Sequence, residues 1–347
     1  MNRSNASDYS VISRYRNITM GLAAILIVIF HSYNLNLDLS FLIGDTIISK
    51  LINTGFIALR QFAIIGVDVF LVLSGLGLYY SYSKDSSLRS FYCKRALRIL
   101  PPLLLVSIPW YAFFSDVPFF KGVLLISFFD KDWTHWYFFL CILLYAVYPL
   151  IHRMADRFGL RGIIIACAAV VAVSVLLWLF ASEFYRTVYV ALDRIPAFLL
   201  GTYLGKLAYE KKPITKRTAR ISLVLLIAMT ILCPVIFILL QNTVYNYFRF
   251  FVHAVYAVLL VLMLSVWFER RPDRPHRMLA FFGGLSMYLY LLYEKTATIF
   301  VDFIHEADHF GFSFYLTVFV ITLVLSIILK EVCARITQIW EQDAKSK

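Results

Sequence analysis

Charged residues are scarce in this sequence. Asp, Glu, Lys and Arg make up only 16% of its 347 residues, against roughly 25% in soluble globular domains. Hydrophobic residues account for 61%, and the mean hydropathy is +0.76. A soluble core could not hide so much apolar surface, whereas a bilayer takes up about 20 apolar residues with each helical span. The composition therefore excludes a sizeable soluble domain and predicts an integral membrane protein.

Cysteine is also scarce, and its positions give no sign of a disulfide or a metal site. Four of the five cysteines fall inside long apolar runs, and one falls in a basic loop. No pair has the short spacing of a zinc site, and no pair is predicted to face an oxidising compartment. The sequence therefore predicts neither feature. The residues are Cys93, Cys141, Cys167, Cys233 and Cys333.

Apolar runs follow one another along the whole chain with only short segments between them. At about 20 residues for each span, they predict an all-α, polytopic membrane protein with about ten transmembrane helices in a single membrane domain, 1–347. The runs cover 18–36, 62–82, 99–115, 135–151, 162–181, 188–208, 221–240, 247–267, 279–301 and 312–333.

Basic residues outnumber acidic ones, and the formal net charge is +12. The excess lies in both tails and in the second, fourth, sixth and eighth loops, and the odd-numbered loops lack it. Cytoplasmic loops of membrane proteins carry such an excess of Lys and Arg. The alternation predicts that both termini are cytosolic, with short tails of about 1–17 and 334–347. Because topology accounts for the charge, no nucleic-acid partner is expected.

Three other features are interpreted structurally. The segment Leu39–Gln61 is amphipathic and is predicted to lie outside without spanning. Phe120–Asp132 is also predicted to lie outside, as a re-entrant or interfacial segment. Gly201 and Gly205 form a G-x-x-x-G pattern, which is typical of close helix packing.

Ionisable side chains inside the apolar runs are candidates for function, because a buried charge in a membrane is costly. At 1.5 Å per residue, His31 lies roughly 20 Å from the cytosolic face, and Asp68, Arg194 and Glu294 lie about 10 Å below the outer face. Taken singly, each could be a structural polar group. Their common depth favours one polar cavity near the outer face, where a histidine and a carboxylate could perform acid–base chemistry.

Arg95 and Arg98 lie in the second cytosolic loop with the i, i+3 spacing that places two side chains on one helix face. Paired guanidinium groups suit the phosphates of a nucleotide-like donor. Contacts with lipid headgroups are the alternative interpretation, and composition alone favours it.

Several further stretches are distinctive, namely Gly21–His31, Gly66–Gly75, Phe91–Pro101, His135–Phe138, Tyr148–Pro149, Arg194–Gly201 and Ser286–Leu291. In this order and over nearly the whole chain, they together resemble the acyltransferase-3 family of bacterial integral membrane acyltransferases. The resemblance implies a ten-helix core of the stand-alone type in the inner or plasma membrane. It also implies acyl-CoA as a co-substrate, with acetyl-CoA preferred and no permanently bound cofactor, and a surface or lipid-linked carbohydrate as acceptor.

By this resemblance His31 is the catalytic residue, and Arg95 and Arg98 engage the donor. Our hypothesis adds that Asp68 orients His31, and that Arg194 or Glu294 contacts the acceptor or the oxyanion.

The chain departs from the family pattern at a few positions. Met20 and Tyr293 stand where many members have Arg and His, and Asn17 stands where Asp is common; Arg16, one turn before Met20, is a candidate replacement for the missing arginine.

Two other functions stay open, namely a carrier or flippase for lipid-linked sugars and an inactive homologue.

Overall fold

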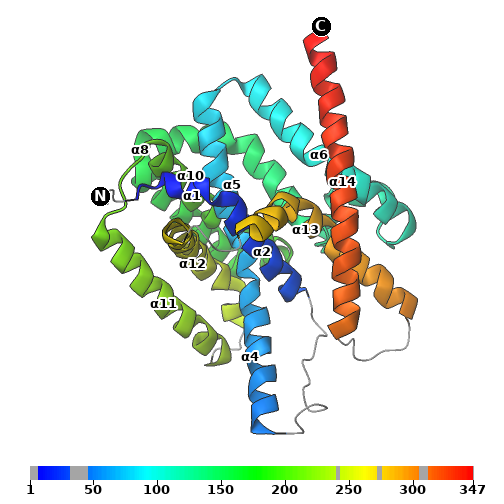
Figure 1. The fold of residues 1–347 in the computed structure, drawn as a ribbon, viewed down its shortest axis with the longest axis horizontal. Coiled ribbons are helices and arrows are strands. Elements are labelled where there is room, and N and C mark those ends of the chain that lie inside the picture. Colours follow the sequence, from blue (N-terminus) through cyan, green and yellow to red (C-terminus); the bar gives the residue numbers. More distant parts are fainter. Residues whose placement is uncertain (1–6, 32–45, 240–242, 272–275, 305–311, 347) are drawn as a thin grey trace.

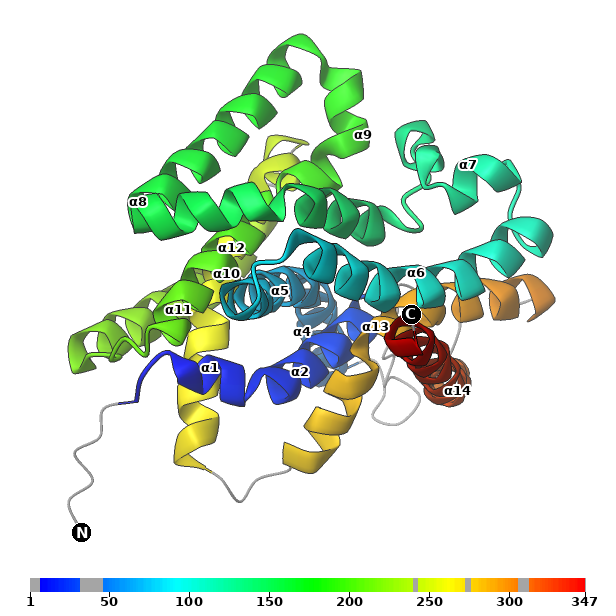
Figure 2. The same cartoon turned by 90° about the horizontal axis from the view of Figure 1, so that it is seen from above.

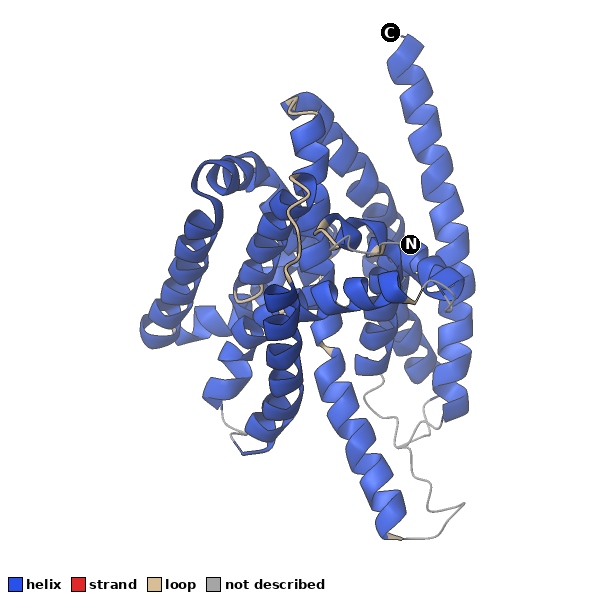
Figure 3. Ribbon diagram, turned by 60° about the vertical axis from the view of Figure 1, so that its left-hand side comes forward, coloured by secondary structure: helices blue, strands red, loops and turns tan. Residues whose placement is uncertain are grey.

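The structure, a computed structural model, describes residues 7–31, 46–239, 243–271, 276–304 and 312–346. Within these ranges the regular elements are helices, apart from one isolated bridge between Asp8 and Pro213 (Figure 3). The prediction of an all-α fold is therefore confirmed for the described part of the chain. In order, the helices are α1 (Ser10–Arg14), α2 (Arg16–Phe30), α4 (Ile47–Ala63), α5 (Ile65–Lys84), α6 (Leu88–Phe113), α7 (Phe119–Val123), the 3-10 helix η1 (Ile126–Asp130), α8 (Trp136–Phe180), α9 (Ser182–Leu192), α10 (Ile195–Tyr209), α11 (Lys216–Leu239), α12 (Thr243–Arg270), α13 (His276–Ile304) and α14 (Phe312–Ser346).

Several helices are long and apolar enough to cross a bilayer. Among the described residues these are Ile65–Lys84, Leu88–Phe113, Trp136–Phe180, Phe248–Arg270 and Ser313–Gln342, and α2 is a shorter apolar helix. The protein is thus a membrane protein, while ten spans and cytosolic termini remain predictions.

Helix α8 joins two of the predicted apolar runs. It consists of two helical segments that cover 135–151 and 162–181 almost completely and meet at a kink in the basic segment between these runs. The direction changes at Gly159, whose φ of 57° and ψ of −139° are not helical. A glycine tolerates this conformation because it has no Cβ.

Helix α5 forms the centre of the bundle, with α2, α6, α8, α10, α12 and α13 around it (Figure 2). Its sequence is apolar on every side, so residues such as Leu71, Leu73 and Leu76 are fully buried. Helix α10 approaches it through Gly75 and Gly201, where an added Cβ would collide with the facing backbone. The packing interpretation of the G-x-x-x-G pattern is confirmed.

Helices α2 and α13 make a second close contact. An added Cβ on Gly21 would collide with the carbonyl oxygen of Leu279, and one on Gly283 with that of Asn17. This contact runs α13 alongside α2, so the part of α13 around Glu294 lies near the end of α2, where His31 is found.

Helix α4 projects from one end of the bundle, and the C-terminal part of α14 projects from the opposite end (Figure 1). Thr46 and Ser49 form a capping box at the start of α4. This helix contains the described part of the predicted amphipathic segment; residues 39–45 lie outside the described residues. The predicted interfacial segment Phe120–Asp132 contains most of α7 and all of η1.

Candidate active site

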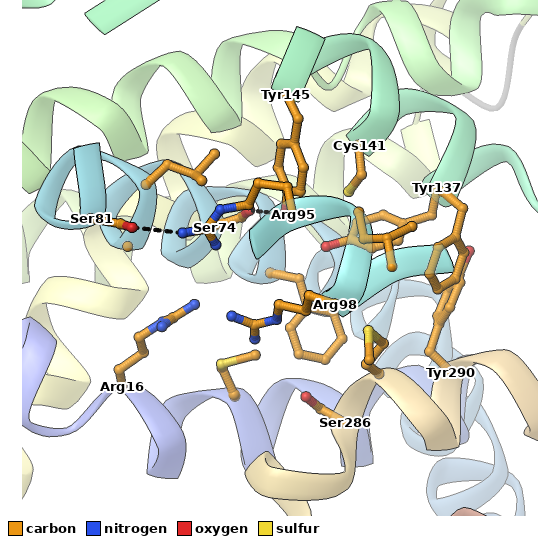
Figure 4. Close-up of a pocket in the computed structure, with 17 residues that line it drawn as sticks. Arg16, Ser74, Ser81, Arg95, Arg98, Tyr137, Cys141, Tyr145, Ser286 and Tyr290 are labelled. Carbon is orange, nitrogen blue, oxygen red and sulfur yellow. Dashed lines mark hydrogen bonds between the residues drawn. The ribbon is translucent and has the colours of Figure 1, made fainter. Parts of the chain in front are cut away.

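A cavity of about 260 Å³ lies among α2, α5, α6, α8 and α13, and three arginines line it. Arg16 comes from the start of α2, whereas Arg95 and Arg98 come from α6 (Figure 4). The sequence predicted that Arg95 and Arg98 share a face, and both line this cavity. Arg16, considered only as a replacement for an absent arginine, lines the same cavity.

Each arginine is held in a different way. An Nη of Arg95 donates a hydrogen bond to Ser81 Oγ at 2.8 Å, and its guanidinium lies 5.6 Å from the ring centre of Phe91. The guanidinium of Arg16 packs over Gly77, where an added Cβ would come within 3.0 Å of Cζ. Arg98 is exposed and points toward Arg16 (Figure 4). Two of the three guanidinium groups are therefore fixed by α5.

Among the described residues, none that lines the cavity has a carboxylate to balance these charges. No Asp or Glu lines it, and within the described part of the chain Arg16, Arg95 and Arg98 form no ion pair. The polar neighbours are hydroxyl groups, including Ser74 and Tyr145, which share a hydrogen bond of 3.1 Å. Clustered unpaired guanidinium groups are suited to bind a polyanion such as phosphate.

The basic lining continues into an adjoining cavity of about 390 Å³. Arg16 and Arg98 line both cavities, and Lys94 and Lys330 join them in the second, with Glu341 as a carboxylate there. An anionic ligand longer than one phosphate would therefore meet positive charge over both cavities.

The turn before α6 positions its two arginines. Ser87 caps the helix, and Asp85 accepts hydrogen bonds from Ser90 Oγ at 2.6 Å and from Lys94 Nζ at 3.1 Å. The hydrogen bonds from Ser90 and then Lys94 lower the pKa of Asp85 to about 2. The Asp85 carboxylate is thus charged at neutral pH and interacts favourably with the positive N-terminal end of α6.

His31 directly follows α2 and lines a much smaller cavity, of about 10 Å³. That volume is about the space of one water molecule. Glu294 of α13 lines the same cavity, and both Glu294 and Lys295 lie near enough to interact electrostatically with His31. The structure therefore brings His31 and Glu294 together, as their common depth suggested.

The small cavity and the arginine cavity share part of their walls. Phe70, Ser286 and Tyr290 line both. Along α2, the 15 residues from Arg16 to His31 span about 22 Å. A thin partition of side chains therefore separates the basic cavity from the histidine.

Asp68 and Arg194 lie in a different polar cluster. An Nη of Arg194 donates to Asp68 Oδ2 at 3.0 Å, and His253 Nδ1 lies 4.0 Å from the same oxygen. The Arg194 guanidinium also lies 4.1 Å from the ring centre of Phe250 and 5.1 Å from that of Trp136. Asp68 and Arg194 are buried, at 0% and 1% exposure.

This geometry corrects the expectation of one cavity around four ionisable residues. His31 and Glu294 line one cavity, whereas Asp68 and Arg194 pair with each other away from it. Within the described residues Asp68 makes no hydrogen bond or ion pair with His31. The reason is that depth fixes only the position along the membrane normal, whereas the direction of each side chain depends on helix packing.

Sequence reasoning missed His253 and gave Lys295 only a local structural interpretation. His253 is an ionisable residue about six positions into the run 247–267, so at 1.5 Å per residue its depth is also roughly 10 Å below the outer face. The depth argument applied to every ionisable residue would have found it. Lys295, beside Glu294, is buried at 5% exposure.

The described helices thus form a membrane protein in which unpaired arginines and a histidine line neighbouring cavities with a shared wall. A comparison with protein families shows that residues 19–331 match the family described as an acyltransferase domain, acyltransferase-3, and the chain belongs to this family. No curated protein and no solved structure gives a significant match. Family membership supports a membrane acyltransferase activity in general.

Proposed function

We propose that the protein is an acyl-CoA-dependent O-acyltransferase that moves an acyl group, with acetyl preferred, across the membrane to a hydroxyl of a cell-surface or lipid-linked carbohydrate. The observation that carries this proposal is the shared wall between the arginine cavity and the His31 cavity, formed by Phe70, Ser286 and Tyr290. It gives a donor bound at the basic end a short route to a base.

The donor's phosphates would bind at Arg16, Arg95 and Arg98. Coenzyme A carries several phosphates, and bidentate hydrogen bonds from guanidinium groups match phosphate geometry. The absence of any Asp or Glu from the cavity wall leaves these charges for a ligand. Lipid headgroups fit the same charges, but the cavity lies among five helices and extends toward His31, which favours a donor with a long arm.

The pantetheine arm would follow the roughly 22 Å from Arg16 to His31 along α2. A cavity of about 10 Å³ at His31 cannot hold a thioester and a hydroxyl together. Movement of Phe70 and Tyr290 in the partition would join the two cavities when the donor binds. A partition that opens only around the bound donor would also limit the access of water to the thioester.

In the chemical step, His31 accepts the proton of the acceptor hydroxyl as its oxygen attacks the thioester carbonyl carbon. The tetrahedral intermediate collapses, the carbon–sulfur bond breaks, and the imidazolium returns the proton to the leaving sulfur. The products are an acyl ester and coenzyme A. Glu294 is the carboxylate beside His31 that would stabilise the imidazolium.

Asp68 and Arg194 would act as positioning residues. Their ion pair joins α5 to the start of α10, and α5 carries Phe70 in the partition. We propose further that both termini are cytosolic, that the protein is a multi-pass protein of the inner or plasma membrane, and that the arginine cavity opens to the cytosol where acyl-CoA is found.

Removal of His31 tests the catalytic role. In membranes supplied with labelled acetyl-CoA, His31→Ala should lower label transfer by about 100-fold or more, the usual contribution of a general base. His276→Ala is the matched control, because His276 lies at the start of α13, at its other end. Full transfer by His31→Ala would reject the role, and movement of unmodified glycan without label would favour a carrier.

A further inference from the structure

A groove of about 370 Å³ runs between α6, α13 and α14. Figure 2 shows these three helices side by side at one edge of the bundle. The lining is almost entirely aliphatic or aromatic, and its outer rim is exposed where a bilayer would lie, with Leu105 at 42% and Ile328 at 54% exposure. An apolar groove that opens sideways into lipid is suited to a hydrocarbon chain.

Among the described residues a single ionisable one, Lys295, lines this groove, and Thr296 lies next to it in the lining. Lys295 is 95% buried, and its Nζ lies 5.6 Å from the ring centre of Trp110. Glu294 and Asp132 interact with it electrostatically, but in the described part of the chain neither forms an ion pair or hydrogen bond with it. A buried, unpaired cation in an apolar groove is costly. An anionic ligand group that pairs with Lys295 would lower that cost.

Lys295 lies next to the residue that lines the His31 cavity. Successive residues of an α-helix point about 100° apart, so Glu294 lines the His31 cavity while Lys295 lines the groove. When His31 is protonated, its ring and Lys295 are both cations and interact electrostatically. An anion at Lys295 would therefore lie within the same helical turn as the carboxylate beside His31.

We infer that this groove binds the acceptor, and that the acceptor is an amphiphile in which a phosphate joins a hydrocarbon chain to a hydroxyl-bearing group. The chain lies between α6 and α14, the phosphate lies at Lys295, and the hydroxyl-bearing group extends to His31. The inference rests on the proposed function and narrows it to a lipid-linked acceptor that enters from the bilayer.

Binding of a prenyl phosphate tests the groove without any reaction. Purified protein in nanodiscs would be titrated with farnesyl phosphate and with farnesol, which has the same chain and no phosphate. Farnesyl phosphate should bind more tightly, and Lys295→Met should weaken it about tenfold, the usual effect of one charge-assisted hydrogen bond. Farnesol binding should be unchanged by this substitution.

A bulky side chain in the groove gives an independent test. Ile328→Trp should abolish binding of both probes, whereas Ile327→Trp should leave binding intact, because Ile327 is exposed on α14 but does not line the groove. Equal affinity for farnesol and farnesyl phosphate, or equally strong competition by phosphatidylcholine, whose headgroup has no hydroxyl, would overturn the inference. Either result would mean that the groove holds ordinary bilayer lipid.

Transfer assays separate this inference from the proposed function. Label from acetyl-CoA should enter a lipid extract with the wild type, and Lys295→Met should lower that transfer while acyl-CoA binding is retained. Unchanged transfer by Lys295→Met, or label in soluble glycan alone, would overturn the lipid acceptor and leave the enzyme standing. No wild-type transfer to any acceptor, with prenyl phosphate still bound at Lys295, would instead reject the acyltransferase proposal.

Discussion

Two polar regions of the bundle contain arginine side chains, and the two regions differ in burial and in ion pairing. Arg194 is 1% exposed, pairs with Asp68 and lies against aromatic rings. Arg16, Arg95 and Arg98 surround an open cavity and have no carboxylate partner among the described residues. In the first region a carboxylate neutralises the Arg194 guanidinium, whereas the second has three guanidinium groups that no described carboxylate neutralises.

The difference separates a structural role from a binding role for the same type of side chain. A buried ion pair is stable only while both charges and their geometry are kept, so the Asp68–Arg194 pair should fix α5 against α10. Replacing an unpaired arginine at a cavity should cost the ligand-free protein little unfolding free energy. Replacements in the first region should therefore change stability, and replacements in the second should change ligand binding.

The largest effect is expected at the buried pair. Asp68→Leu leaves the Arg194 guanidinium without its carboxylate, and loss of one partner of a buried pair costs about 3–5 kcal/mol of unfolding free energy. Arg194→Met should cost a similar amount. The double variant Asp68→Leu with Arg194→Met should recover much of the loss. Thermal unfolding of the purified variants in detergent measures all three.

If the losses of unfolding free energy in the two single variants simply add in the double variant, the structural role of the Asp68–Arg194 pair is contradicted. Additivity would mean that the two side chains stabilise the bundle independently. Unchanged transfer activity in a stable double variant would also remove the positioning role of the pair, since its members would then hold nothing that the reaction needs.

A smaller effect, on binding alone, is expected at the arginine cavity. Arg95→Ala or Arg98→Ala should each raise the KM for acyl-CoA about tenfold or more, because each removes a charge-assisted hydrogen bond of roughly 1.5–3 kcal/mol. The unfolding temperature should barely change. Arg89→Ala is the matched control, because Arg89 is exposed on the same helix and lines neither basic cavity. If these substitutions instead lower the unfolding temperature and leave the affinity for acyl-CoA unchanged, Arg95 and Arg98 have a structural role like that of Arg194.

The sequence predicted the membrane character and the helical fold well, because long apolar runs have few alternatives in a bilayer. It also predicted the shared face of Arg95 and Arg98 and the packing role of Gly201, since both follow from helical spacing over a few residues. Arg16 was harder to assign. Its place in the cavity depends on how α2 packs against α5, with Ala23 against Gly66 and the Arg16 side chain over Gly77, which no local pattern contains.

The partners of the buried charges could not be predicted from depth. His31, Asp68, Arg194 and Glu294 were estimated at one level, but a level leaves the direction around each helix open. The close contacts at Gly21 and Gly75 decide that direction, because they fix how α13 meets α2 and how α10 meets α5. As a result Glu294 lies beside His31, and Asp68 faces Arg194.

The smallest effect is expected at the turn that precedes the arginines. Asp85→Asn removes the charge that Ser90 and Lys94 bind, and should raise the KM for acyl-CoA only a few-fold, because Arg95 and Arg98 remain in place. A depressed folded-state pKa gives stability that is present above the unfolded pKa and lost as pH falls through about 2. The KM ratio of variant to wild type should therefore be the same from mildly acidic to mildly basic pH. A ratio that changes over this range would mean that Asp85 titrates near neutrality and interacts with the donor directly, which would extend the binding region beyond the three arginines.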